Sequence, residues 1–336
     1  VTTGAVNASG ALGMDGGDVS LDGGAGSVVV ASITTRGARG PVSTTAPTDG
    51  HDGGNVAVSG ATIAIGSVDS RGGDASAIAT GTTEITREGG DAGAIALAAG
   101  QITLTSGLDA SGGAGAANSP SLVSGLAGDS ADVLVDGALL LAANATTGIV
   151  NSIRGDHVEG TGAVSRADIR AAGETALVVT AKRGIGFGGD LSAGRIDLEL
   201  ASGNLDLAAG GVSQVSADTI RLSASDGNGG STTGEVMLAG LLLANEAGDA
   251  APKSFTLDQD RSIGGAAGSP VPDGGLFLGG SISGADHSVA LISHDGEVVL
   301  GPSEVATFAG TSLTLAANGL AGSTGYAVRV DGSGLD

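Results

Sequence analysis

The sequence contains no cysteine and no tryptophan, and it has only one tyrosine and four phenylalanines in 336 residues. Without cysteine, the fold has neither a disulfide nor a thiolate-bound metal. Large aromatic side chains, which bury about 150–250 Å² each, are not there to anchor a thick core. We therefore expect an elongated molecule whose thin core is filled by small and branched aliphatic residues.

Basic residues are also scarce, because 14 lysines and arginines stand against 36 aspartates and glutamates, for a formal net charge of −22. A field of this sign repels phosphate backbones, so we expect no nucleic-acid partner, and anionic membrane surfaces are disfavoured for the same reason. No apolar run reaches the ~18 residues of a membrane-spanning helix, so no membrane insertion is expected. Because the sequence starts at Val1, we expect a mature form or an excised piece.

Glycine, by contrast, is abundant, with 64 residues against 7 prolines, and the hydrophobic share of 41% is too high for a disordered chain. Glycine pairs recur in one motif, which reads "GGDV" from Gly16, "GGNV" from Gly53, and "GGDA" from Gly72 and again from Gly89. The first interval between these starts is close to twice each of the two that follow. The intervals therefore predict a repeat unit of about 17–20 residues.

Apolar and polar residues alternate within each unit, as in "NVAV" at 55–58, "TIAI" at 62–65 and "QITLT" at 101–105. A period of two is the signature of a β-strand with one side chain set facing inward. Gly, Asn, Asp and Ser separate the runs, and we expect them to supply positive φ angles or side-chain turns at corners.

One such unit cannot fold alone, because its few inward aliphatic side chains do not offset the entropy of ordering it. Stacked units share ladder hydrogen bonds and inward packing. The sequence therefore predicts an all-β parallel β-helix, or β-solenoid, with rungs of about 17–20 residues, as a single domain over 1–336. Loop insertions that contain proline are expected near 37–54, 111–130, 245–254 and 264–275.

Three segments, "GGNVAVSGATIAIGSVDSRGG", "AGQITLTSGLDASGG" and "GRIDLELASGNLDLAAGG", resemble the shaft repeats of the filamentous haemagglutinin family. These are large bacterial exoproteins of two-partner secretion systems, and the resemblance covers about residues 15–330. It implies an internal shaft region, folded as a right-handed parallel β-helix. It also implies export through an outer-membrane secretion partner, a secreted or cell-surface location, and adhesion to a receptor or glycan on a host or neighbouring cell.

A polysaccharide lyase or hydrolase is the alternative function, because parallel β-helices also carry such enzymes. Their sites use aromatic platforms for sugar rings, and this chain has few aromatic residues. Asp197 and Glu199 share one face of a predicted strand, which is more typical of its solvated side. No nucleophile–base constellation is present in the sequence, so we expect a protein that is not an enzyme.

Two groups of residues are candidates for binding. Arg154, Gly155 and Asp156 form an Arg-Gly-Asp tripeptide, which predicts cell adhesion, although a chain rich in glycine and aspartate also produces it by chance. Carboxylates gather beside one histidine and could hold calcium, or could be solvated turn residues. The residues of this second group are Asp15, Asp18, Asp22, Asp49, His51 and Asp52. No other metal and no cofactor is expected.

The two ends of the sequence carry no amphipathic helix that would cover an open rung. Open strand edges pair readily with other strands. We therefore expect flanking rungs or end-to-end association.

Overall fold

A computed structural model describes residues 1–41, 48–76, 86–117, 126–142, 150–162, 164–166 and 176–187, and beyond residue 187 the strands β13–β27. All regular secondary structure in these residues is β-strand, and the large majority of strand pairs are parallel. The predicted all-β class with parallel pairing is thus confirmed. This part of the chain holds no helix that is long and apolar enough to cross a membrane.

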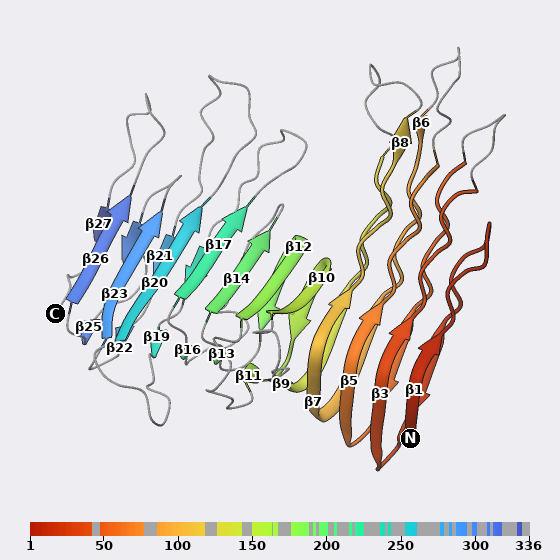
Figure 1. The fold of residues 1–336 in the computed structure, drawn as a ribbon. Coiled ribbons are helices and arrows are strands. Elements are labelled where there is room, and N and C mark those ends of the chain that lie inside the picture. The colour runs from red at the N-terminus through yellow and green to blue at the C-terminus, as the bar shows by residue number, and fades with distance from the viewer. Residues whose placement is uncertain are drawn as a thin grey trace. The chain divides into compact units, whose positions relative to one another are not determined.

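The chain divides into two compact units, Val1–Ala142 with Ser152–Val158 (unit 1) and Ala143–Asn151 with Glu159–Asp336 (unit 2). Nine strands lie in unit 1, which is coloured red to yellow-green in Figure 1. They are β1 (Thr2–Asn7), β2 (Val19–Asp22), β3 (Ser27–Thr34), β4 (Val56–Ser59), β5 (Thr62–Asp69), β6 (Thr86–Arg87), β7 (Ile95–Asp109), β8 (Ala116–Ala117) and β9 (Val133–Leu141). Residues 152–158 of β10 (Val150–Gly160) also belong to this unit.

The register of unit 1 shows how the chain stacks on itself. Val19 pairs in parallel with Val56, and Val56 pairs with Ile95, so equivalent residues recur after 56 − 19 = 37 and 95 − 56 = 39 positions. We call the chain from one residue to its parallel partner a layer. The rung length predicted from the sequence is wrong for unit 1, because one layer takes about twice that length. The shorter intervals between glycine pairs in the sequence arise because one layer contains two such pairs, for example those that begin at Gly72 and Gly89.

The core of unit 1 consists of aliphatic columns in which like stacks on like. Ile33 pairs with Val68, and Val68 pairs with Leu108, so one inward position is aliphatic in three successive layers. All three side chains are buried. A second column contains Val56, Ile95 and Val133, also buried. This packing needs only branched side chains, which explains how a stable core forms with so few aromatic residues.

Within each layer of unit 1, the chain runs away from the strands in one segment, which we call the outgoing leg. It then runs back to the strands in a second segment, which we call the returning leg. Figure 1 draws these legs as narrow chain pairs beyond the ends of the β1, β3, β5 and β7 arrows. The outgoing legs include residues 35–41, 70–76 and 110–117, and the returning legs include residues 15–18, 48–55, 86–94 and 126–132. Short β6 and β8 pair antiparallel between two legs.

Glycine pairs are needed in the legs because backbone packs directly on backbone. The Gly90 N–H donates to the Gly73 carbonyl at 2.9 Å, and the Gly73 N–H donates to the His51 carbonyl at 2.7 Å. A Cβ on Gly72 would lie 1.8 Å from the Gly90 oxygen. Positive φ occurs in unit 1 only at Gly13, Gly24 and Gly137 among the described glycines. The glycine pairs of the legs are therefore needed for close backbone packing and not for positive φ, which was one of the two roles expected of the residues between the runs.

The described parts of two predicted insertions, 37–54 and 111–130, lie in these legs and share their hydrogen bonds with the next layer. For example, the Gly37 N–H donates to the Arg71 carbonyl at 3.0 Å. Of the other two, only residues 253–254 are described, and 264–275 lies wholly outside the described residues. The single-domain boundary of 1–336 stays a prediction.

Unit 2 contains the remaining strands, coloured green to blue in Figure 1. They are β11 (Val164–Arg166), β12 (Ala176–Phe187), β13 (Leu191–Ser192), β14 (Arg195–Leu200), β15 (Leu205–Asp206), β16 (Val215–Ser216), β17 (Thr219–Ala224), β18 (Val236–Leu238), β19 (Leu241–Leu242), β20 (Lys253–Asp260), β21 (Leu276–Leu278), β22 (Ile282–Ser283), β23 (His287–Ser293), β24 (Val298–Leu300), β25 (Phe308–Ala309), β26 (Ser312–Ala317) and β27 (Val328–Val330).

Parallel pairing continues within unit 2. Leu177 pairs with Ile196 and Ile196 pairs with Ile220, so the register advances by 196 − 177 = 19 positions and then by 220 − 196 = 24 positions. Ile220 then pairs with Leu257, a further advance of 257 − 220 = 37 positions. The first advance agrees with the rung length predicted from the sequence, and the later ones are longer.

Candidate functional site

A ladder of aspartates runs along the returning legs of unit 1, one per layer. The Asp52 N–H donates to Asp15 Oδ1 at 3.0 Å, and the Asp91 N–H donates to Asp52 Oδ1 at 2.8 Å. The Asp129 N–H continues the ladder to Asp91 Oδ1 at 2.7 Å. All four side chains are exposed. Each carboxylate that accepts in this way is therefore fixed by the backbone of the next layer, although it faces solvent.

The geometry of the leg explains why aspartate or asparagine follows the glycines. Exposed residues recur every third position, at Asp49, Asp52 and Asn55, which is the spacing of a polyproline II-type chain with no internal hydrogen bonds. The Gly53 N–H donates to the Asp91 carbonyl in the next layer, and the Gly54 N–H donates across to the outgoing leg at Thr35.

In Gly53-Gly54-Asn55, and in the equivalent residues 92–94 of the next layer, the N–H of the third residue points outward, where the backbone offers no acceptor. The side chain of the preceding layer supplies one: the Asn55 N–H donates to Asp18 Oδ1 at 2.7 Å, and the Ala94 N–H donates to Asn55 Oδ1 at 2.9 Å. The Gly-Gly-Asp/Asn triplet is thus a device for satisfying backbone donors between layers.

Replacing Asp52 with alanine removes the acceptor for the Asp91 N–H, whereas asparagine at the same position keeps an oxygen there. We expect Asp52→Ala to destabilise unit 1 by about 1 kcal/mol, the usual net value of one hydrogen bond, and Asp52→Asn to cost less. Amide hydrogen exchange at Asp91 measures this directly. Equal exchange rates at Asp91 in the two variants would contradict the acceptor role.

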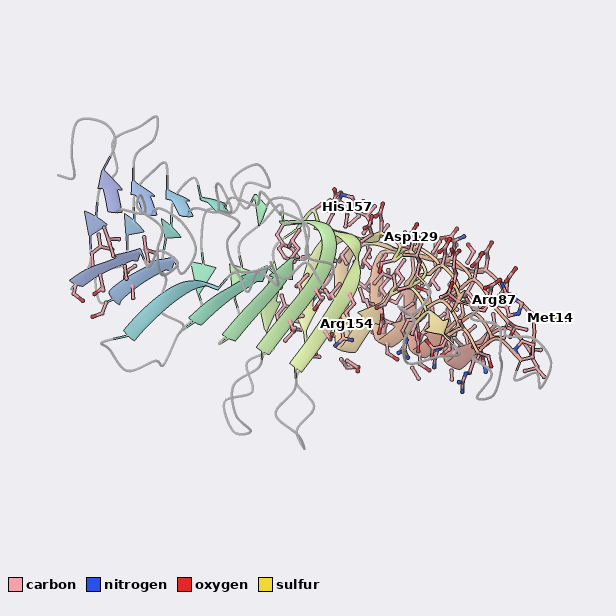
Figure 2. The ribbon with its side chains drawn as sticks, turned by 90° about the horizontal axis from the view of Figure 1, so that it is seen from above. Met14, Arg87, Asp129, Arg154 and His157 are labelled. Carbon is pink, nitrogen blue, oxygen red and sulfur yellow. The ribbon has the colours of Figure 1, made fainter. Side chains whose placement is uncertain are left out.

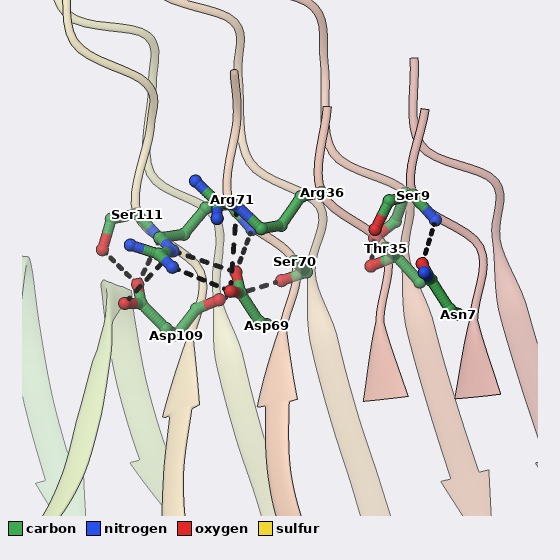
Figure 3. Close-up of polar contacts among 10 residues, drawn as sticks. Asn7, Ser9, Thr35, Arg36, Asp69, Ser70, Arg71, Asp109 and Ser111 are labelled. Atoms are coloured by element: carbon green, nitrogen blue, oxygen red, sulfur yellow. Dashed lines mark hydrogen bonds and ion pairs between the residues drawn. The ribbon is translucent and has the colours of Figure 1, made fainter. Parts of the chain in front are cut away.

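A second polar network links the outgoing legs, as Figure 3 shows. Arg71 donates from Nε to Asp69 Oδ1 at 2.9 Å and from Nη2 to Asp69 Oδ2 at 2.8 Å. The Arg71 Nε also lies 3.6 Å from Oδ2 of Asp109, which belongs to the next layer. Arg36, which belongs to the preceding layer, has its Nε 3.8 Å from Asp69 Oδ2. Alternating charges therefore connect three layers.

Burial on its own would raise the pKa of Asp69, but the hydrogen bonds and charge of Arg71, with the charge of Arg36, outweigh it, so the pKa lies below its usual value. A carboxylate whose pKa is lower in the folded state stabilises the fold above the unfolded-state pKa of about 3.9. This contribution is lost as the pH falls through the folded-state pKa.

Unit 1 is therefore expected to lose stability on acidification below about pH 4, the usual range of aspartate. The Asp69→Asn variant is less stable at pH 7, because it cannot form the ion pair, and it loses less on acidification. Urea unfolding followed at several pH values between 2 and 7 measures the difference. Parallel pH profiles for the two proteins would contradict the assignment.

Three side chains with metal-ligand atoms converge where the last returning leg, residues 126–132, meets β10. Asp132, Asp156 and His157 each offer one such atom, and these atoms lie within 4.8 Å of one another. His157 Nδ1 is 3.3 Å from Asp132 Oδ1 and 3.2 Å from Asp156 Oδ2. One imidazole nitrogen and two carboxylates could hold a divalent ion of the zinc or manganese type, or form ion pairs with a protonated histidine.

The carboxylates that the sequence suggested for calcium are spread over several places. Asp15 Oδ1 lies 3.4 Å from His51 Nδ1, so these two meet. Asp22 instead accepts hydrogen bonds from the Gly24 N–H and the Ser59 hydroxyl, and these bonds hold the pKa of Asp22 below its usual value. Asp49 accepts from the Glu88 N–H, further along the leg. Calcium binding stays a prediction.

The Arg-Gly-Asp tripeptide lies in β10 and not at a turn. Arg154 is exposed, Gly155 is buried, and Asp156 is only 4% exposed. The Asp156 N–H donates to the Ala131 carbonyl at 2.8 Å, which ties the tripeptide to the last returning leg. Figure 2 labels Arg154 and His157 on opposite sides of the ribbon. Adhesion through the tripeptide stays a prediction.

The sequence carries a signal for some of these contacts. Asp69 and Asp109 each directly follow a buried aliphatic residue and stand at the same register position, so predicting their proximity required the layer spacing. His157 is half-buried against Asp156, and no paired metal-ligand spacing in the sequence marks it. Asp197 and Glu199 lie in β14, and their side chains are outside the described residues.

Comparisons with protein-family models, with curated proteins and with solved structures give no match to this chain.

Proposed function

We propose that this chain is a right-handed parallel β-helix that serves as the shaft of a secreted or surface-exposed bacterial exoprotein, of the filamentous haemagglutinin type, and mediates attachment or cell–cell contact. The observation that carries the proposal is the layer-to-layer bonding of unit 1. There, aliphatic columns, glycine legs and side-chain ladders all join one layer to the next.

A shaft has to resist bending and local opening along its length. In a stacked repeat, each layer is stabilised by its two neighbours, so stability grows with the number of layers. The legs add a second set of hydrogen bonds to those of the strands, at positions such as Gly53 and Gly72. Ionic side chains such as Asp69 and Arg71 also bond within and between layers. Because these polar groups bond to neighbouring layers, they favour a structural role for unit 1.

Attachment would then involve the surface between or beyond the ladders, with a cell-surface receptor or glycan as partner and an outer-membrane protein for export. Beads coated with the purified chain are expected to bind to cultured epithelial or bacterial cells. The control is an unrelated protein of matched negative charge. Binding no greater than that of the control would contradict the adhesive role.

The same assay tests the tripeptide separately. Arg154 is exposed, so Arg154→Ala changes the surface without touching the core. If the tripeptide is the adhesive element, this variant loses most of the binding. If beads coated with the variant bind like the parent, attachment uses another surface of the shaft.

A further inference from the structure

Within the described residues, the first layer of unit 1 is bonded to another layer on one side only. β1 pairs with β3 and β2 pairs with β4, and Figure 1 shows β1 at the outer edge of the unit. The next layer is bonded on both sides, because β3 pairs with β1 and β5, and β4 pairs with β2 and β7. We call the outward side of β1, β2 and residues 15–18 the first-layer face.

Inward aliphatic side chains are partly uncovered at the first-layer face. Val6 pairs with Ile33, and Leu21 pairs with Val58, in the same columns as the core. Ile33 is 0% exposed and Val58 is 2% exposed, whereas Val6 and Leu21 are half-exposed. The face thus presents the apolar pattern that a covering layer buries elsewhere in unit 1.

Backbone donors of the leg are also left open there. In the second layer, the Asp52 N–H donates to the Asp15 carboxylate and the Asn55 N–H donates to the Asp18 carboxylate. The corresponding N–H groups in the first layer, those of Asp15 and Asp18, have no acceptor within the described part of the chain. Because Asp15 and Asp18 are three residues apart, their acceptors would have to be two side-chain oxygens with the same spacing on the leg of a neighbouring layer.

We propose that the first-layer face binds a further polypeptide layer that contains a β-strand and a leg of the form Asp-Gly-Gly-Asp/Asn. An ordinary β-strand would pair with β1 but would leave the Asp15 and Asp18 N–H groups without acceptors. The interface between the first and second layers contains both strand pairing and carboxylate acceptors for the leg N–H groups. The same interface, repeated on the other side of the first layer, would supply both kinds of bond. This inference concerns the layer interface and does not depend on the adhesive function.

The register defines how such a layer can be attached for a test. Thr2 pairs with Val29, so the position before Val1 is equivalent to residue 27, and Ser27 itself pairs with Thr62. A copy of the segment 27–62 is therefore fused directly before Val1 of the full chain. The copied Asp52 and Asn55 then lie below Asp15 and Asp18.

Amide hydrogen exchange reads out the docking. With the native copy, the Asp15 and Asp18 amides are expected to exchange at least about tenfold more slowly than in the parent chain. The matched control carries Asp52→Ala and Asn55→Ala in the copy only, and it is expected to protect the β1 amides without protecting these two.

Equal exchange of the Asp15 and Asp18 amides in the extended and parent chains would overturn the proposal. Equal protection by the native and the doubly substituted copy would overturn the requirement for the Asp-Gly-Gly-Asp/Asn leg. The Asp91 amide, two layers away, reports in every protein that unit 1 itself is folded. Failure of the bead assay would leave this result unchanged, so the two proposals are tested separately.

Discussion

The Gly72→Ala substitution is expected to destabilise unit 1 by at least about 4 kcal/mol, well beyond the usual effect of adding one methyl group. The new Cβ would lie 1.8 Å from the Gly90 oxygen and 2.4 Å from the Gly90 carbonyl carbon. Both contacts are with backbone, which cannot rotate away as a side chain can. The two legs would have to separate, and the hydrogen bonds across them would break.

The matched control is Gly4→Ala in β1, where a Cβ would meet nothing within 4 Å. This control is expected to change stability by no more than about 0.5 kcal/mol. Urea unfolding, together with hydrogen exchange of unit 1 amides, measures both variants. A Gly72→Ala protein as stable as the Gly4→Ala protein would mean that the legs are not packed backbone on backbone.

The Leu97→Ala substitution is expected to cost about 2–5 kcal/mol, because it leaves a cavity inside an aliphatic column. Leu97 is 0% exposed and pairs with Val58 in the layer before and Val135 in the layer after. The cavity therefore weakens the packing of both neighbouring layers, and the amides of β4 and β9 should exchange faster as well.

Leu12→Ala is the control for this experiment, because Leu12 is 78% exposed. We expect it to change stability by less than about 0.5 kcal/mol. If truncation at residue 97 had as small an effect as truncation at residue 12, the columns would not be the core of unit 1. Measuring urea unfolding of both variants at one pH keeps the contribution of Asp69 constant.

The all-β class and the parallel stacking followed from the sequence because both depend on local alternation and repetition. Runs such as 62–65 and 101–105 do lie in β5 and β7, with Ile63 and Ile102 buried in one column. The length of a layer did not follow, because outgoing and returning legs carry the same glycine pairs. An interval counted from Gly72 to Gly89 is then half a layer and not a whole one.

The role of the aspartates was also beyond a local reading of the sequence. Asp52 next to glycine has the composition of a turn, and its true partner, the Asp91 N–H, belongs to the next layer. The same applies to the tripeptide, whose Asp156 is buried because Ala131 and His157 lie against it in the fold. Such contacts depend on which layers are neighbours, and the layer spacing must be known first.

The period of three along the legs limits how the length of this protein can change during evolution. Adding three residues to both legs of a layer extends them by about 9 Å and keeps every glycine facing the neighbouring leg. Adding one or two residues would turn side chains such as that of Asp52 into the glycine contact and glycines out to solvent. Coding-sequence insertions of nine base pairs in each leg, or duplications of an entire layer, preserve this phase.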